Sequence, residues 1–262
     1  MFFSLPSWAL ALIILAVIGG ASLAGALAAR YLRKHMDTLR EPIGVLQGAL
    51  LGVVGLILAF GLSLAVGRYE ARRAAVVDEA NAIGTAYLRA QLIGEPERSR
   101  SLELFPPYTD LTLRIAKEIP GSDSQKRTTA AESVLQRRLW RLAGMSIAAA
   151  PQASAERLYV DSLNDMFDQQ TARASALNNR VPGAVLDLEV IAAALAIGVL
   201  ALYLSALGRG LVTVVAAAAL VTLLLLVTFD LDRPTRGLIK IPATPLQSVR
   251  ASMILPPAAG GH

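Results

Sequence analysis

Cysteine is absent from this 262-residue chain, and histidine occurs only twice. Without cysteine there is no disulfide, no thiolate nucleophile and no cysteine-bound zinc or iron–sulfur centre. The two histidines, His35 and His262, cannot assemble a histidine triad or a multi-histidine metal site within one chain. A P-loop, a nucleophile elbow and a His-Glu-x-x-His helix are also missing. The sequence therefore predicts a protein that is not an enzyme and that holds no cofactor and no metal.

Charged residues are scarce as well, at 17% of the chain, while hydrophobic residues make up 54% and the mean hydropathy is +0.51. These values are too apolar for an ordinary water-soluble domain and indicate a membrane protein. In such a protein, the net charge of +5 reflects topology or contact with anionic lipid, so no nucleic acid partner is expected.

Four apolar runs are long enough to cross a bilayer core, which takes roughly 20 helical residues. They are Trp8–Ala29, Gly44–Val66, Val190–Leu207 and Leu211–Phe229. Residues 67–183 between the second and third runs are rich in charge and contain no apolar run of that length. The predicted fold class is therefore all-α, a polytopic membrane protein with four transmembrane helices and a helical soluble domain inserted between the second and third.

The predicted domains are the first two transmembrane helices (8–66), the soluble domain (67–183), the last two transmembrane helices (184–229) and a C-terminal tail (230–262). Apolar residues at helical spacing as far as Ala90 predict that the second span continues as a helix into the soluble domain, and Gly94 and Pro96 are expected to end it. Further helices are expected at about 101–118, at 125–150 and from 154 to just before Pro182. Along the continuation of the second span, the charged residues are expected to lie largely off the apolar face: Glu70, Arg72, Asp78 and Glu79.

Small residues recur every three or four positions along the second span: Gly44, Gly48, Gly52, Gly55, Ala59, Ser63 and Gly67. This spacing places them on one continuous helix face. Such a face is typical of close helix packing, because small residues let backbones approach where no hydrophobic effect drives association. The alternative is a pore-lining face in an oligomer, with Leu51, Leu58 and Leu62 forming a hydrophobic constriction.

Charged residues gather at the helix ends on one membrane face: Arg68, Arg72, Arg73, Asp187, Glu189, Asp230, Asp232 and Arg233. Interfacial ion pairs are one interpretation of this charge cluster. A charged vestibule or gate is the other. Asp187 with Glu189, or Asp230 with Asp232, also form carboxylate pairs that suit a divalent cation, although residues two apart on a helix point in different directions.

Basic residues decide the orientation in the membrane. With four spans, both termini and the soluble domain share one side, which carries Arg68, Arg72, Arg73, Arg173, Arg180, Arg233, Arg236 and Lys240 near the membrane. The opposite side carries Arg30, Arg33, Lys34, Arg40 and Arg209. Eight against five predicts a cytoplasmic soluble domain and cytoplasmic termini, although the crowded first loop argues the other way.

Three separated blocks resemble the bacterial bestrophin-like integral membrane proteins, over about Gly52 to Met253. The blocks are "RYEARRAAVVDEANAIGTAYLRA" (68–90), "LNDMFDQQTARASALNNRVP" (163–182) and "DLDRPTRGLIKIPATPL" (230–246). The resemblance implies four membrane helices with a large cytosolic helical insertion in the inner membrane, and a ring-shaped homo-oligomer; bestrophins themselves are pentameric anion channels. This chain departs from bestrophins in its second span, where a glycine and alanine face and a single aromatic residue, Phe60, replace their bulky neck.

Two functions follow as hypotheses. The first is a homo-oligomeric membrane ion channel or pore, anion-conducting by resemblance, with the second span near the axis. Its partners are copies of itself, membrane lipid and inorganic ions. The alternative is a non-conducting membrane sensor, scaffold or partner-binding protein in which the small residues are buried packing.

Overall fold

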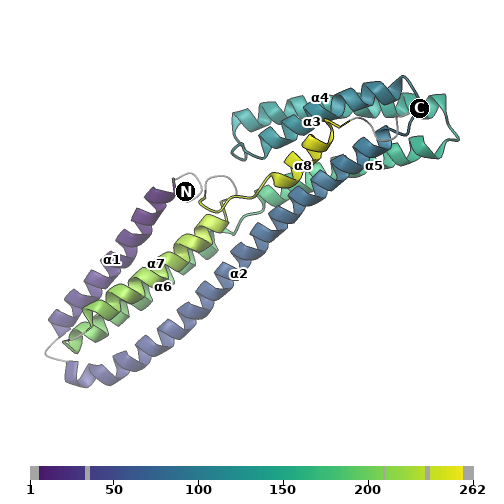
Figure 1. Ribbon diagram of the computed structural model, residues 1–262. Helices are drawn as coiled ribbons and strands as arrows, with labels where there is room; N and C mark the ends of the chain where they lie inside the picture. The colour runs from purple at the N-terminus through teal and green to yellow at the C-terminus, as the bar shows by residue number, and fades with distance from the viewer. Residues whose placement is uncertain (1–5, 33–35, 209, 234–236, 256–262) are drawn as a thin grey trace. The chain divides into compact units, whose positions relative to one another are not determined.

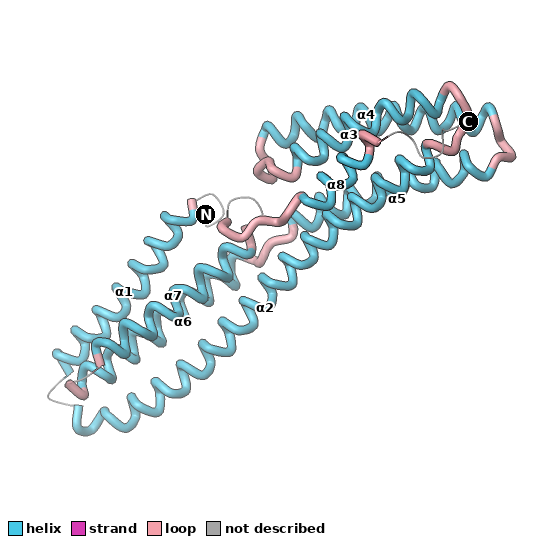
Figure 2. Tube along the Cα trace, viewed as in Figure 1, coloured by secondary structure: helices cyan, strands magenta, loops and turns pink. Residues whose placement is uncertain are grey.

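The computed structural model describes residues 6–32, 36–208, 210–233 and 237–255. The described residues form eight helices joined by turns, without a strand, which confirms the all-α prediction (Figure 2). The chain divides into two compact units. The membrane unit takes the residues up to Tyr69 together with Arg180–Lys240, and the soluble unit takes Glu70–Asn179 together with the residues from Ile241 onward.

Four described helices are long and apolar enough to cross a membrane. They are α1 (Ser7–Tyr31), the first part of α2 (Met36–Ala90), α6 (Gly183–Ala206) and α7 (Leu211–Leu231) (Figure 1). These helices confirm the four predicted spans. The apolar stretch of α2 ends near Val66, yet the helix continues without interruption to Ala90, as the periodicity of its apolar residues predicts.

The membrane unit has its own core, in which residues spaced about one helical turn apart face inward. On α1 these are Leu10, Ile14 and Ile18, which pack in one cluster with buried residues of α6 such as Ala193 and Ile197. Many other large apolar side chains of these helices point outward, for example Leu12, Leu15, Leu195 and Leu220. An outward apolar surface suits helices surrounded by hydrocarbon.

The turn between α6 and α7 depends on glycine. Gly208 has φ +67° and Gly210, which precedes α7, has φ +105°. Residues with a Cβ rarely adopt this left-handed backbone, so glycine at both positions lets two antiparallel spans follow each other within a short turn.

The soluble unit contains the second part of α2 and four further helices. These are α3 (Glu97–Ile115), α4 (Asp123–Ala149), α5 (Ser154–Asn178) and α8 (Thr244–Ser252). Helix α4 begins where the Ser122 hydroxyl accepts a hydrogen bond from the backbone N–H of Gln125 at 3.2 Å, an N-cap that satisfies one free amide of the first turn. The three predicted soluble helices are confirmed with shifted ends, α3 beginning at Glu97 rather than near residue 101.

The predicted C-terminal tail is not a separate segment. Its residues up to Lys240 group with the membrane unit, whereas α8 belongs to the soluble unit, where Leu246 is fully buried in the core with Ile83 and Met253. Helix α8 was not predicted because it is short, although Pro245 in its first turn is a helix-start signal. Residues 256–262 of the predicted tail lie outside the described residues, as do Arg33, Lys34, Arg209 and Arg236 of the topology count.

Candidate functional site

Several small residues of α2 are not covered by other described parts of the chain. We call Gly48, Gly52, Gly55, Ala59 and Ser63 the small-residue stripe. A Cβ built on Gly48, Gly52 or Gly55 would meet no described atom within 4 Å, and Ala59 and Ser63 are exposed. The stripe is therefore not buried against any described part of its own chain. At one end, Gly44 differs, since a Cβ there would lie 3.2 Å from the ring of Tyr203.

The face of α2 that does pack within the membrane unit is a different one. Val54, Leu58 and Ala65 are buried there, and Gly61 lies between them against Glu189 of α6. Leu58, expected as part of a hydrophobic constriction, is only 5% exposed and belongs to this core. It cannot line a pore without leaving the core, so that part of the prediction is wrong.

Close backbone approach inside the chain occurs between α1 and α6 instead. A Cβ built on Gly25 would overlap the backbone of Gly198, and one built on Gly198 would lie 3.2 Å from the carbonyl oxygen of Ala21. These two glycines perform the packing role that small residues have in membrane helices. The sequence does not indicate which of these small residues are packed inside the chain and which are open. Only the packing of the helices shows the difference.

A third face of α2 carries bulky apolar side chains that are also exposed: Val53, Leu56, Phe60 and Leu64. It adjoins the small-residue stripe around the helix, because these positions follow those of the stripe by one residue. Between Gly44 and Val66 the helix has no charged residue. Both open faces of α2 are thus uncharged, one smooth and one bulky, and both are available to lipid, to another copy of the chain or to water.

The charge cluster is not a single site, since its members serve different local structures. Asp230, at the end of α7, accepts backbone N–H groups of Leu238 (2.9 Å) and Ile239 (2.8 Å) through its two carboxylate oxygens. Both carboxylate oxygens of Asp232 lie 3.2 Å from the N–H of Val181. These two carboxylates hold the segments that enter α6 and leave α7, in the manner of a cap.

The two acids of the other predicted pair lie in different environments. Asp187 is exposed, whereas Glu189 is completely buried beside Gly61. Neither predicted carboxylate pair therefore converges on one point. Within the part of the chain that the structure describes, no group of three or more acidic or histidine side chains is placed to hold a metal ion.

The basic residues of the charge cluster also lie in different environments and have different partners. The buried Arg72 guanidinium donates to the backbone oxygens of Ala176 (3.2 Å) and Asn179 (2.8 Å) at the end of α5, where a cation suits the helix C-terminus. Arg73 makes an exposed ion pair with Glu70 at 3.5 Å. Arg233 is buried in the membrane unit, and its backbone N–H donates to the carbonyl oxygen of Asp230. Arg72 was expected off the apolar face, and its burial corrects that expectation.

We predict that Asp232→Ala lowers stability by roughly 1–3 kcal/mol, because it removes the acceptor of a buried backbone N–H. The exposed Asp187 provides the matched control, and Asp187→Ala is expected to leave stability unchanged. Thermal unfolding of the purified protein in detergent measures both. Equal melting temperatures of the two variants would mean that the Asp232 carboxylate does not stabilise the fold.

A buried polar network in the soluble unit is the feature that sequence reasoning missed. Glu79 of α2 forms an ion pair with Arg173 of α5, and both side chains are almost completely buried. Glu132 of α4 lies close by, and its carboxylate accepts Thr112 Oγ1 at 2.7 Å and Gln170 Nε2 at 3.1 Å. Glu79 was expected off the apolar face. The structure corrects this expectation, because Glu79 is buried. Its partner Arg173 lies on another helix, so the local sequence of α2 gives no sign of the pair.

Arg173 faces the Glu79 carboxylate, and its charge also acts on Glu132, which changes the proton affinities of both acids. Burial raises the pKa of Glu79 to about 7 against the lowering effect of Arg173, and the charge of Glu132 adds to the rise. Burial also raises the pKa of Glu132, against its hydrogen bond from Thr112 and the charge of Arg173. A buried site with two acids and one base retains a proton more readily than an exposed carboxyl group.

The fold and the open apolar helix together define a class, the multi-pass helical membrane proteins. A model of the Bestrophin-like domain matches residues 12–246, which is most of the chain. The chain therefore belongs to the bestrophin-like family, in agreement with the resemblance of its three sequence blocks. No curated protein matches its sequence.

Solved structures share the fold. A crystal structure of a bacterial bestrophin homolog from Klebsiella pneumoniae, solved by Zn-SAD phasing, is similar with a TM-score of 0.65 and 13% identity, over 94% of this chain and 99% of that chain. Two variants of that homolog give TM-scores of 0.67 and 0.64 at 14% and 15% identity, over 92% and 90% of this chain and 97% of theirs. At such identities the likeness concerns the fold alone.

Proposed function

We propose that this protein is a homo-oligomeric membrane ion channel in which α2 lies near the axis. The observation that carries the proposal is the small-residue stripe, which stays open along the membrane part of α2 while the opposite face of that helix is buried. Anion conduction rests on the resemblance to bestrophins, and the ring-shaped assembly has the same support.

The small-residue stripe is expected to be covered by something other than lipid tails. Within a bilayer, a groove of glycine and alanine leaves bulky lipid tails poorly packed, whereas another helix or a column of water fills it well. Other copies of the chain can supply either, as packed neighbours or as the remaining walls of a pore. An uncharged path narrowed by apolar side chains is also a recognised design for a gate that opens by wetting.

The orientation proposed is the one with more basic residues on the inner side, in a bacterial inner membrane. The soluble unit and both termini then face the cytoplasm, and the soluble unit forms a cytosolic vestibule. Lipid surrounds the outward apolar residues of the membrane helices, and inorganic ions are the conducted species.

Cryo-electron microscopy of the purified protein in a lipid nanodisc tests the assembly, and ion flux into liposomes tests conduction. We expect a closed ring with the small-residue stripe of α2 around an axial path, together with flux above that of empty liposomes. A monomer, or a ring whose axis is filled by packed side chains, would contradict the channel and favour the non-conducting sensor or scaffold.

A further inference from the structure

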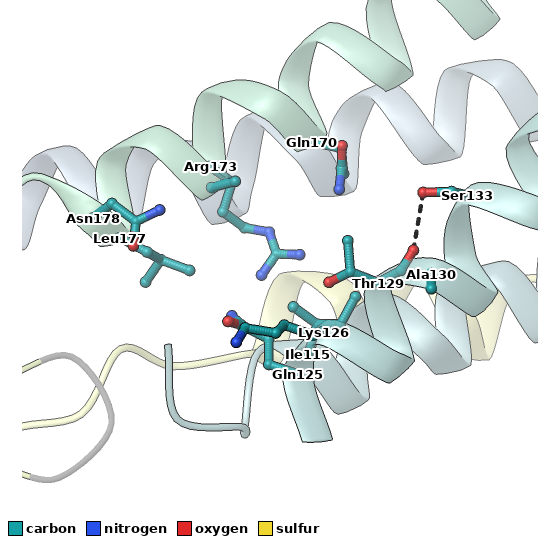
Figure 3. Close-up of a pocket in the computed structure, with 11 residues that line it drawn as sticks. Ile115, Gln125, Lys126, Thr129, Ala130, Ser133, Gln170, Arg173, Leu177 and Asn178 are labelled. Atoms are coloured by element: carbon teal, nitrogen blue, oxygen red, sulfur yellow. Dashed lines mark hydrogen bonds between the residues drawn. The ribbon is translucent and has the colours of Figure 1, made fainter. Parts of the chain in front are cut away.

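A cavity of about 470 Å³ lies within the soluble unit, between one face of α4 and one face of α5 (Figure 3). From α4 it is lined by residues spaced along one helix face: Gln125, Lys126, Thr129, Ala130 and Ser133. From α5 it is lined in the same way by Gln170, Arg173, Ala174, Leu177 and Asn178, and Ile115 of α3 completes it. Its volume falls in the range of pockets that hold small organic molecules.

The charge of the lining has one sign. Arg173 and Lys126 contribute two positive charges, and none of the lining residues is acidic; the Glu79 carboxylate that pairs with Arg173 lies outside the lining. Lys126 stands at the exposed rim, where it makes a solvent-accessible pair with Asp123 at 3.4 Å, which contributes little. Arg173 is the deep charge, with a side chain only 3% exposed that extends from α5 toward α4 in Figure 3.

The Arg173 guanidinium has a donor group without a hydrogen-bond partner among the described residues. Its Nε atom faces Glu79, whereas its Nη1 atom is buried without a hydrogen-bond partner among the described residues. A buried guanidinium N–H without an acceptor is costly, and a planar fork of donors matches a carboxylate. An anion in the cavity that Arg173 lines would supply the missing acceptor.

The other lining residues indicate which further chemical groups a ligand of this cavity would carry. The lining also contains the hydroxyl and amide side chains of Thr129, Ser133, Gln125 and Asn178, together with the apolar side chains of Ile115 and Leu177. Ser133 Oγ already donates to the carbonyl oxygen of Thr129 at 2.9 Å, so its oxygen is left to accept from a ligand (Figure 3). A mixed lining of this volume suits an organic molecule with a short carbon chain better than a small inorganic ion.

We propose that this cavity binds a small organic carboxylate, with one carboxylate group on Arg173 and a second polar or acidic group directed toward Lys126. The proposal does not depend on ion conduction. A ligand there joins α4 to α5 and shares the guanidinium that holds Glu79 of α2, so binding would stiffen the soluble unit.

Isothermal titration calorimetry on the full-length protein in detergent tests this proposal, with glutarate as the probe and glutaramide as its uncharged analogue. We expect saturable binding of glutarate and none of glutaramide, because only the former carries carboxylates for Arg173 and Lys126. Lys126→Gln is expected to weaken glutarate binding by about threefold, since it removes only the exposed rim charge.

A pair of neighbouring alanines on α4 provides the matched variants. Both alanines are exposed on α4, but only Ala130 lines the cavity. Ala130→Phe fills the cavity and is expected to weaken binding by about tenfold or more, while Ala131→Phe leaves it within about twofold. Ser133→Leu repeats the filling test if Ala130→Phe fails to give a monodisperse protein.

Three results would overturn the proposal. The first is an absence of saturable glutarate binding to the wild-type protein, and the second is equal binding of glutaramide. The third is wild-type affinity in a well-folded Ala130→Phe or Ser133→Leu variant, which would place the bound anion elsewhere. None of these results bears on the channel, because the titration is independent of ion flux.

Discussion

Gly55→Leu is expected to abolish the ring assembly or to lower ion flux by about tenfold or more, because it places a bulky side chain on the face that the proposal assigns to the axis and the neighbouring copies. Its effect on the single chain should be small. A Cβ at Gly55 meets no described atom within 4 Å, so the substitution adds volume outside the packed core of the membrane unit. Gly52→Leu is expected to behave in the same way, since Gly52 is equally open.

Val53→Leu is the matched control. Val53 is 57% exposed, lies in the same turn of α2 and belongs to the bulky face rather than to the small-residue stripe. We expect it to keep both assembly and flux. Size-exclusion chromatography with light scattering measures the first and liposome flux the second. Equal effects of Gly55→Leu and Val53→Leu on both properties would remove the special role of the stripe.

Gly61→Leu separates a folding defect from an assembly defect. A side chain at Gly61 would overlap the carboxylate of Glu189, so this variant is expected to lose thermal stability as a single chain. Gly55→Leu should instead melt as the wild type does, while failing to assemble or conduct. If Gly55→Leu melted as early as Gly61→Leu, the stripe would be part of the core rather than an open face.

Arg173→Met is expected to lower the free energy of unfolding of the soluble unit by about 3–5 kcal/mol, because it leaves the buried Glu79 carboxylate without its counter-charge. The loss should be larger at pH 8 than at pH 5, since protonation of Glu79 at the lower pH removes the unpaired charge. Arg141→Met on the exposed surface of α4 is the control, and it is expected to change stability little. Equal stability of Arg173→Met and the wild type would mean that the ion pair is replaceable by packing.

The wild-type protein should also lose stability as pH rises. The Glu79 pKa is about 7 in the folded protein against 4.5 for the free side chain, so between these values the folded state binds more protons than the unfolded state. The contribution is complete below pH 4.5 and declines as pH rises toward 7, by about 3 kcal/mol in total. The raised pKa of Glu132 acts in the same direction.

Glu79→Gln is expected to flatten this decline, whereas Asp78→Asn at the adjacent exposed position is expected to preserve it. The chain has two tryptophans, of which Trp140 lies in the soluble unit, 6.1 Å from the ring of Phe167. In a Trp8→Phe background, Trp140 fluorescence during urea unfolding therefore reports on the soluble unit. An unchanged slope in Glu79→Gln would assign the pH dependence to other groups.

The secondary structure was largely predictable, because its signals are local. Hydropathy over about 20 residues marks the spans, and the spacing of apolar residues extends the second span to Ala90. Short or weakly patterned features escaped this approach, as α8 did. The three blocks of family resemblance also depend on residues alone, and the family match over residues 12–246 agrees with them.

The candidate sites were less predictable. The stripe of small residues on α2 is visible in the sequence, but so are Gly25 and Gly198, and nothing in the spacing says which of them is buried. The charged residues of the soluble unit show the same limit. Glu79 and Asp78 are neighbours with similar chemistry, yet one is completely buried in an ion pair and the other is exposed.

Composition and periodicity are enough to predict four membrane-spanning helices with a charged helical insertion, because they control which segments enter hydrocarbon and which form helices. The bestrophin-like family follows instead from the three sequence blocks and the family match. The packing of the helices was needed to show that the small-residue stripe stays open, that Asp230 and Asp232 cap backbone segments, and that Arg173 lines a cavity beside two buried acids. These features depend on which helix faces meet, and that is settled by side chains far apart in the sequence.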